Sequence, residues 1–491
     1  MKLRIPIGAA LAALLAACAM QPAQQAADLA RVQHVIVIYA ENRSFDNLYG
    51  LFPGADGIAN ATPAQYTQVD RDGTPLAHLP PVWKGKEADP AFPRDLPNHP
   101  FRIDGPPMSL PLSLATRDLI HEYWRNQEQI DGGRNDRFVA ASDAGALTMG
   151  YYDGSTLPLW KWAREYTLAD HFFMGAFGGS YLNHIWLVCA CTPVDRDAPA
   201  NLRPQLDARG WLKTRPTSSA SVLDGAPEFF TGEVTPDGYS VNTTQPPYQP
   251  SRVPPAKGGD PRMTDPAQHV LPPQTLKTIG DTLSAKGVSW AWYAGAFDAA
   301  VQDGMQPPEV KRAVIYNTAK GAPNFVAHHQ PFNYFARFAP GTPDRAEHLK
   351  DYRELVAGID RGDLPAVTFY KPQGSLNEHP GYADVLSGDE HIAALLARIK
   401  ASPLWPSSVV IVTYDENGGF WDHVPPPKGD RWGPGSRIPT LIVSPFARKG
   451  YVDHTSYDTT SILKFITRRF GLEPLPGVRP GAGDLTPALE P

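Results

Sequence analysis

Two apolar stretches of this chain end in the same unusual way, with acidic and amide side chains at the point where a buried strand would stop. Residues 35–42 read VIVIYAEN, and residues 410–417 read VIVTYDEN. Their β-branched runs predict strands that are buried on both faces. One such polar tip is typical of a turn or a helix cap. Because the pattern occurs twice, it favours a chemical role for both strand ends.

Other apolar runs alternate with helical patterns along the chain. Predicted strands begin near residues 167, 288, 364, 407 and 438, and predicted helices cover residues 389–400 and 459–470. This alternation predicts an α/β fold with a mostly parallel central sheet and helices on both faces. Ligands of open α/β sheets bind beyond the carboxyl ends of the strands. We therefore expect four polar side chains to gather at one edge of the sheet: Glu41, Asn42, Asp415 and Glu416.

Composition limits the classes of partner and the domain organisation. The chain has 491 residues, a net charge of -6 and no long run of Lys or Arg, so no nucleic acid binding is expected. Its 52 prolines indicate long ordered loops. Two Pro-rich intervals, near 53–112 and 193–275, are interpreted as insertions within a single catalytic domain that covers 31–491.

The N-terminus has the pattern of an export signal. Two basic residues precede an apolar stretch that is too short to span a bilayer, and residues 15–18 (LAAC) resemble a bacterial lipobox. The prediction is a lipoprotein signal peptide over 1–17, an acylated Cys18 and a tether over 18–30. This places the protein in the bacterial cell envelope, as a periplasm-facing or outer-membrane lipoprotein bound to the membrane by its lipid anchor. The alternative is an ordinary secretory signal that happens to contain a cysteine.

The remaining two cysteines, Cys189 and Cys191, are separated by one residue. A disulfide between them is possible outside the cytoplasm but strained, and we favour two small buried side chains.

A third segment, residues 170–187 (DHFFMGAFGGSYLNHIWL), runs from a strand through two glycines into a helical pattern. Ser180 stands at the start of that helix, where backbone N–H groups favour a phosphate. It is therefore a candidate nucleophile, and an ordinary helix N-cap is the equal alternative. An oxygen-rich cluster favours a divalent cation, which would lower the pKa of a coordinated hydroxyl. His184, on the same helical face as Ser180, is expected to be a packing residue.

Four blocks of the sequence are similar to those of one known family. ENRSFDNLYG, GGSYLNH, YDENGGFWDHVPPP and the segment 149–173 resemble the signature blocks of the bacterial phosphoesterase family, which contains respiratory-burst-inhibiting acid phosphatases and phosphatidylcholine-type phospholipases C. The resemblance implies an alkaline-phosphatase-like sheet, a phosphoserine intermediate on Ser180, and one divalent metal ion, with Zn, Ca or Mg left open. The residues that match its metal ligands are Glu41, Asn42, Ser180, Asp415 and Glu416.

Several histidines lie in blocks that resemble the phosphate-binding segments of family members, and we expect them to stabilise the transferred group. The candidates are His99, His328, His329 and His379, together with Asn242 as a further hydrogen-bond donor. A structural role is the alternative for each histidine. Asp422 and His423 are equally compatible with support of the metal and with bracing of a loop.

The GGS motif and the lipobox favour the phosphatase branch of the family. The resemblance implies that its phospholipases instead tend to carry a GPT-like motif, with threonine at the position of the nucleophile. The predicted function is a metal-dependent acid phosphatase that hydrolyses phosphomonoesters. One alternative is a phospholipase C that acts on choline phospholipids, with an aromatic cage drawn from residues 289–297 and Trp124, although such aromatics are more often core. Another is a non-catalytic envelope-binding lipoprotein.

Overall fold

The structure is a computed structural model that describes residues 29–490. The predicted signal peptide, the acylated Cys18 and nearly all of the predicted tether lie outside these residues.

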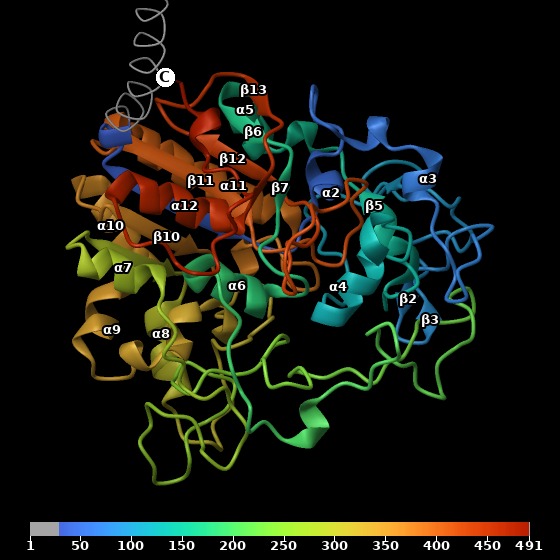
Figure 1. Cartoon of the computed structure of the whole chain (residues 1–491), viewed down its shortest axis with the longest axis horizontal. Coiled ribbons are helices and arrows are strands. Elements are labelled where there is room, and N and C mark those ends of the chain that lie inside the picture. The colour runs from blue at the N-terminus through green and yellow to red at the C-terminus, as the bar shows by residue number, and fades with distance from the viewer. Residues whose placement is uncertain (1–28, 491) are drawn as a thin grey trace, which may run out of the picture.

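A central sheet organises the fold (Figure 1). In the described part of the chain it has eight strands, of which only β12 runs antiparallel to the others. In spatial order these strands are β13 (Tyr451–Asp453), β6 (Thr167–Ala169), β12 (Thr440–Val443), β11 (Ser408–Tyr414), β1 (His34–Ala40), β10 (Val367–Lys371), β8 (Trp290–Ala294) and β9 (Leu349–Asp351). The predicted α/β class with a mostly parallel sheet is confirmed.

Helices cover both faces of this sheet. The helices α5, α11 and α10 pack in succession on one face, and α12, α6 and α7 pack on the other (Figure 1). The α-helices are α2 (Phe45–Tyr49), α3 (Pro63–Tyr66), α4 (Tyr123–Ile130), α5 (Pro158–Glu165), α6 (Ser180–Cys189), α7 (Ile279–Ala285), α8 (Phe297–Gly304), α9 (Pro343–His348), α10 (Tyr352–Arg361), α11 (Val385–Ala401) and α12 (Thr459–Phe470).

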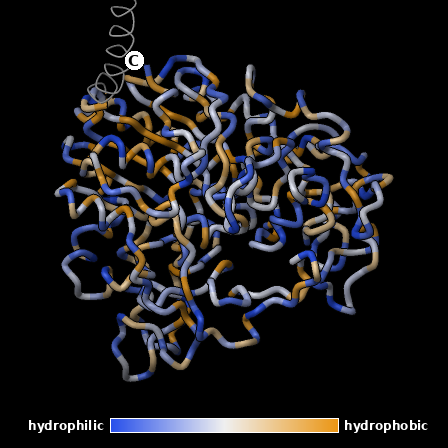
Figure 2. The backbone as a smooth tube through the Cα atoms, in the orientation of Figure 1, coloured by the Kyte–Doolittle hydropathy of each residue, from blue (hydrophilic) through white to orange (hydrophobic). Residues whose placement is uncertain are grey.

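The core lies between the sheet and these helices. Strands β1 and β11 form the centre of the sheet, and their side chains are buried on both faces, as their continuous apolar sequences require. Figure 2 shows hydrophobic segments concentrated in the region of the sheet. Helix α12 ends as its sequence predicts, because Gly471 adopts the left-handed conformation just beyond Arg468 and Arg469.

The two Pro-rich intervals carry little regular structure. Residues 53–112 contain α3, one 3₁₀ turn and the short strands β2 (Trp83–Lys84), β3 (Glu87–Ala88) and β4 (Phe101–Arg102). Residues 193–275 form long loops at the lower edge of Figure 1, with one 3₁₀ turn at Ala200–Leu202. Three further short strands are β5 (Gly150–Tyr151), β7 (Phe172–Phe173) and β14 (Tyr457–Asp458).

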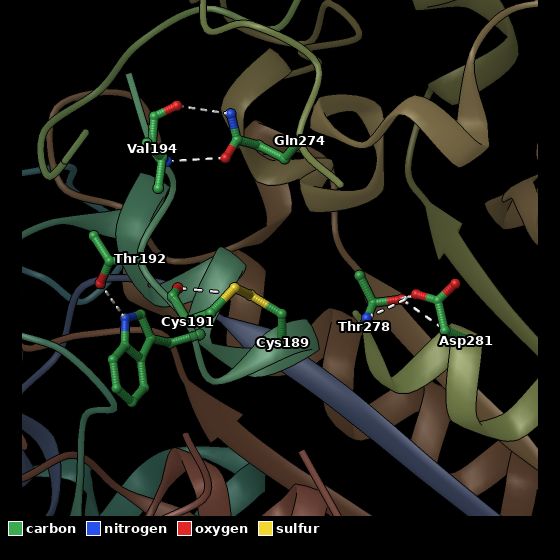
Figure 3. The surroundings of a disulfide bond; sticks show 8 residues. Cys189, Cys191, Thr192, Val194, Gln274, Thr278 and Asp281 are labelled. Atoms are coloured by element: carbon green, nitrogen blue, oxygen red, sulfur yellow. Dashed lines mark hydrogen bonds between the residues drawn. A yellow bond between two sulfur atoms is a disulfide. The ribbon is translucent and has the colours of Figure 1, made fainter. Parts of the chain in front are cut away.

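Cys189 and Cys191 form a disulfide bond (Figure 3), so the interpretation of two unpaired core cysteines was wrong. The reason is the end of α6, where Ala190 adopts a left-handed conformation with φ of 47°. This reversal brings the two Cα atoms to 5.1 Å, within the usual range for a disulfide. The adjoining loop is fixed by Gln274, whose side-chain amide bonds both backbone groups of Val194.

Within residues 29–490, no helix combines the length and the apolar character needed to cross a membrane.

Candidate functional site

The two polar strand tips meet at the carboxyl edge of the sheet. Strands β1 and β11 are parallel neighbours, and Ala40 pairs with Tyr414, so the next residues, Glu41 and Asp415, leave the sheet side by side. The backbone N–H of Asn42 then donates to Oδ1 of Asp415 at 3.0 Å. Asn42 has a φ of 58°, a left-handed conformation that asparagine tolerates better than most residues. The predicted gathering of these tips is a direct result of the strand register.

Ser180 reaches the same place from another part of the fold. It is the first residue of α6, and its hydroxyl donates to Oδ1 of Asn42 at 3.2 Å and lies 3.4 Å from Oε1 of Glu416. The side chain is 2% exposed. The N-terminus of α6 therefore presents a buried hydroxyl to a group of acceptor oxygens, next to the positive end of the helix dipole.

The two glycines before Ser180 serve close packing of the backbone. A Cβ atom on Gly178 would lie 2.5 Å from the backbone nitrogen of Tyr123, and one on Gly179 would lie 2.6 Å from the carbonyl oxygen of His121. Gly178 also has a φ of 95°. The glycines thus allow residues 121–123 to lie directly against the start of α6, rather than only opening space for a ligand.

Three carboxylates are buried together in this cluster. Glu41, Asp415 and Glu416 are each 0% exposed. Burial, together with repulsion from Glu41, raises the pKa of Asp415 well above its usual range; burial and the neighbouring Asp415 do the same for Glu416. Oε2 of Glu41 and Oδ2 of Asp415 accept no hydrogen bond, whereas Oε1 of Glu41 forms ion pairs. Such oxygens in a buried, like-charged group fit a divalent cation, which would neutralise the charge and occupy the free lone pairs.

Histidines and a lysine lie on the other side of Glu41. Its Oε1 is 2.5 Å from Nε2 of His329 and 3.2 Å from Nζ of Lys371. His184 stacks on His329 at 4.7 Å between ring centroids, and its Nδ1 lies 2.8 Å from the backbone oxygen of Ser180. Burial and Lys371 lower the pKa of both imidazoles well below the usual value, which keeps them neutral. Glu41, His184 and His329 also offer three ligand atoms within 4.8 Å of one another.

His121 is a site residue that the sequence did not reveal. Its Nε2 lies 3.6 Å from Oε1 of Glu416 and 3.4 Å from the amide nitrogen of Asn42. Burial lowers its pKa, but the carboxylates of Glu416 and Asp118 outweigh burial and raise the pKa to about 10. The residue directly precedes the N-cap of α4 and belongs to no recognisable motif. Its contact with Gly179 is visible only in three dimensions.

Two further predicted histidines lie beside this cluster. The ring of His379 is 5.6 Å from that of His121 and stacks on Tyr382 at 4.3 Å. The ring of His328 is 4.5 Å from that of His329, and its Nδ1 is 2.8 Å from the hydroxyl of Tyr316. Burial and nearby cations lower the pKa of His328 to about 3. Neutral imidazoles therefore form one wall of the site.

Asn242 lies at the entrance to the site, and its polar atoms are already in use. Its side-chain oxygen accepts from the backbone N–H of Tyr123 at 2.9 Å, and its amide donates to the carbonyl of Gly232 at 2.7 Å. It fixes the segment that carries His121. Its predicted contact with a phosphate stays a prediction.

His99 is not brought together with the other candidates. Its Nδ1 lies 2.7 Å from the carbonyl oxygen of Pro100, and its ring packs 6.4 Å from that of Tyr66. Among the residues that the structure describes, these contacts join His99 to the 53–112 insertion and not to Ser180. The catalytic role expected for His99 gains no support from this placement.

The other candidates have structural surroundings. Asp422 and His423 join a buried ion-pair network around Arg437, whose guanidinium bonds Asp422 at 2.9 Å and Asp46 at 3.1 Å. This network braces the loop after β11. Trp290 and Trp292 lie in the buried strand β8, so the aromatic segment 289–297 supplies core rather than a binding cage.

A cavity of about 450 Å³ opens beside His121 and Gly179. Three carboxylates, Asp118, Glu122 and Glu233, lie in its wall. Among the described residues that line this cavity, there is no lysine or arginine. The cavity is large enough for part of a substrate. His121, whose raised pKa keeps it protonated, also lines it, and Glu122 is paired with Arg125 at 3.2 Å. Asp118 and Glu233 therefore carry the negative charge that would attract a cationic group.

Comparison with known proteins identifies relatives of this chain. Residues 32–473 match the phosphoesterase family. Phospholipase C B of Mycobacterium tuberculosis is 24% identical over 486 residues, which cover 92% of this chain and 75% of that protein. The non-hemolytic phospholipase C of Pseudomonas aeruginosa is 24% identical over 519 residues, which cover 96% of this chain and 59% of that protein.

Among solved structures, a protein of the alkaline phosphatase superfamily from Vibrio parahaemolyticus is similar at 11% identity and a TM-score of 0.34. The match covers 79% of this chain and 76% of that one.

Proposed function

The chain belongs to the phosphoesterase family, and we propose from this that it hydrolyses phosphoric esters through a covalent intermediate on Ser180. One observation carries the proposal: the Ser180 hydroxyl stands at the N-terminus of α6, within 3.4 Å of both Asn42 and Glu416, inside a cluster of buried carboxylates. A buried serine in this position serves no hydrophobic purpose, and the helix N-terminus favours a bound phosphate.

The proposed ligands of one divalent cation are the oxygen atoms of five residues, Glu41, Asn42, Ser180, Asp415 and Glu416. When bound, such a cation lowers the pKa of a coordinated hydroxyl and offsets the charge that develops on a phosphoryl group. Two buried oxygens that accept no hydrogen bond, Oε2 of Glu41 and Oδ2 of Asp415, support this assignment.

The remaining steps belong to side chains of the protein. Oγ of Ser180 gives its proton to a neighbouring carboxylate, for which Oε1 of Glu416 at 3.4 Å is placed, and attacks phosphorus, while the bond from phosphorus to the leaving oxygen breaks. The leaving oxygen must take up a proton, and His121, on the cavity side of Ser180, is in the best position to donate it. Water then loses a proton to the now neutral His121 and attacks phosphorus, the bond from phosphorus to Oγ breaks, the phosphate product leaves, and Oγ regains its proton. His379, next to His121, would fix the orientation of that imidazole.

The first candidate substrate is a phosphodiester of the phospholipase C type. The named relatives are phospholipases C. The cavity beside His121 offers room for a second substituent on phosphorus, and two of its carboxylates, Asp118 and Glu233, suit a cationic head group such as choline. They would also repel a dianionic monoester. This reverses the order of preference that the GGS motif suggested.

A phosphomonoester is the second candidate. The imidazoles of His121, His328 and His329 and the ammonium of Lys371 lie together around Glu41 and Glu416. Such a set of donors could satisfy the additional charge of a terminal phosphate. A non-catalytic scaffold would have no use for a buried hydroxyl within a cluster of three buried carboxylates.

A lipid anchor on Cys18 remains part of the proposal. It would hold the enzyme at a membrane of the cell envelope, close to phospholipid substrates. Release of the protein by a Cys18→Ser substitution, measured by fractionation, would test it.

The substrate is tested by comparing three compounds under equal conditions: p-nitrophenylphosphorylcholine, p-nitrophenyl phosphate and phosphatidylcholine vesicles. The proposal expects higher kcat/KM for the choline diester than for the monoester, with release of phosphocholine from the vesicles. A strong preference for the monoester would favour the phosphatase. No turnover of any of the three would contradict both candidates.

A further inference from the structure

A second group of metal-binding side chains lies at the same edge of the sheet, away from Ser180. It consists of Asp170, His171 and His454, whose ligand atoms all lie within 4.8 Å of one another. Asp56 lies on the far side of His171, with Oδ2 at 3.5 Å from Nε2, the ring nitrogen that does not face Asp170. The proposed mechanism uses none of these residues. Their role does not depend on the function proposed for the Ser180 cluster.

The strand register builds this group. Strands β6 and β13 are parallel neighbours, and Ala169 pairs with Asp453, so Asp170 and His454 both follow the last pair. The next short strands, β7 and β14, pair as well, through Phe172 and Tyr457. The two chain segments between these pairs run side by side. The histidines are therefore positioned by hydrogen-bonded backbone on both sides.

The side chains converge on the carboxylate of Asp170. Nδ1 of His171 lies 2.8 Å from Oδ1 of Asp170, and Nδ1 of His454 lies 2.8 Å from Oδ2 and 3.0 Å from Oδ1. Asp170 is fully buried, and Oδ2 accepts from the backbone N–H of Asp56 at 2.7 Å, which fixes its orientation. His454 is 60% exposed, so the group is open to solvent on one side.

The charges leave room for a divalent cation. The guanidinium of Arg437 approaches this region, but its charge is balanced by Asp46 and Asp422. It gives Asp56 and Asp170 only hydrogen bonds to their backbone carbonyls. Asp170 supplies one negative charge among the three ligand atoms, and Asp56 supplies a second beside them, with its Oδ1 at 3.2 Å from Nε2 of His423.

We propose that Asp170, His171 and His454 form a second metal site that binds Zn²⁺ or a similar borderline transition ion, and that Asp56 orients His171 through its other ring nitrogen. Zinc takes imidazole nitrogen and carboxylate oxygen in a tetrahedron, with bonds of about 2.0–2.2 Å, so that ligand atoms lie about 3.3 Å apart. Nδ1 of His171 and Nδ1 of His454 each lie 2.8 Å from an oxygen of Asp170, so small movements of these side chains would give the spacing of ligand atoms around zinc. Two imidazoles distinguish this site from the oxygen-rich cluster at Ser180, which suits harder cations better.

The site would tie two distant parts of the chain together. It joins the ends of β6 and β13 with the segment after α2 that carries Asp56. A bound ion would therefore resist separation of the outer strands and raise the melting temperature without contact with the substrate.

The test is a count of bound zinc on the full chain after EDTA treatment and dialysis, by native mass spectrometry and calorimetric titration with Zn²⁺. The variants are His171→Ala and His454→Ala. The matched control is His269→Ala, because His269 is also 25% exposed and also lies against a buried aspartate, Asp195, at 3.1 Å. A further variant, Asp415→Asn, alters only the Ser180 cluster and so shows whether zinc binds there instead.

The expected result is one zinc ion that binds to the wild type, to His269→Ala and to Asp415→Asn, and whose affinity falls by at least about 100-fold in His171→Ala and His454→Ala. Co²⁺ bound there should give the visible absorption of a tetrahedral site, and this band should be missing in the same two variants. Equal zinc affinity in all the proteins, or zinc binding that only Asp415→Asn removes, would overturn the proposal.

Discussion

The hydroxyl of Ser180 lies 3.2 Å from the side-chain oxygen of Asn42, although the two residues are 138 positions apart. The contact depends on two independent features, the turn after β1 and the entry into α6. Because both end at the carboxyl edge of the sheet, a nucleophile and a set of acceptor oxygens meet in one buried place. Most of the chemistry proposed for the protein depends on this meeting point.

Loss of a carboxylate should cost bound metal. Glu41→Gln keeps the shape of the side chain but removes one negative charge from the buried cluster. We expect it to bind the catalytic divalent ion at least about 10-fold more weakly and to lower turnover. Elemental analysis after dialysis, with Glu87→Gln at an exposed position as the control, provides the measurement. Wild-type occupancy in Glu41→Gln would mean that Glu41 is not a ligand.

His121 should matter most for poor leaving groups. His121→Gln removes the proposed proton donor, so turnover of an alkyl phosphoester should fall by about 100-fold or more. A p-nitrophenyl ester, whose leaving group needs no proton, should lose much less. A series of substrates with leaving groups of increasing pKa measures this difference. In His121→Gln, kcat/KM should fall more steeply with leaving-group pKa than in the wild type. An equal loss for all leaving groups would assign His121 to binding rather than to proton transfer.

The carboxylates of the cavity should select the head group. Glu233→Gln removes a negative charge from the cavity wall, so KM for the choline diester should rise by about 2- to 5-fold, the effect of one partly exposed ion pair. KM for p-nitrophenyl phosphate should stay the same or fall. Steady-state kinetics on both substrates provide the test. If KM rose for the monoester alone, the cavity would not be the part of the site that selects the head group.

A buried aspartate outside the site should make stability depend on pH. Burial raises the pKa of Asp389 from 3.8 to about 7, so the folded state keeps a proton that the unfolded chain has lost. Between about pH 4 and pH 7 the free energy of unfolding should therefore fall as the pH rises.

Asp389→Asn removes this cost and can still accept the hydrogen bond from the N–H of Leu159. At pH 8 the variant should be more stable than the wild type by about 1 to 4 kcal/mol, and the difference should shrink towards pH 4. Urea unfolding at several pH values measures it, with exposed Asp72→Asn as the control. A variant that is less stable than the wild type at pH 8 would contradict the prediction.

Local sequence was sufficient for the elements that carry the site. Continuous apolar runs predicted β1, β10 and β11, and the polar tips of β1 and β11 were expected to meet because parallel strands end at one edge. The glycines before Ser180 indicated a close approach of the backbone to a ligand, but in the structure they allow residues 121–123 to pack against α6. These features are short-range, and each is determined by a few neighbouring residues.

The residues that sequence missed depend on long-range packing. His121 comes near Ser180 only because Gly178 and Gly179 let a distant segment lie against α6. Lys371 is the last residue of β10, and its side chain contacts Glu41, which follows the neighbouring strand β1. The disulfide depended on the left-handed conformation of one alanine, which no local pattern predicts. Conversely, His99 lies in a motif that resembles a phosphate-binding segment, yet its contacts keep it in an insertion.

Trapping of the phosphorylated enzyme tests the central claim, that Ser180 is the nucleophile. The wild type, Ser180→Ala and a control, Ser387→Ala, are mixed with radiolabelled substrate and quenched in acid, and labelled peptides are identified by mass spectrometry. We expect label on Ser180 in the wild type and in the control. In Ser180→Ala, which should keep its melting temperature, we expect no label and a loss of turnover of at least about 1,000-fold. Near wild-type turnover by a folded Ser180→Ala protein, or label on another residue, would contradict the account.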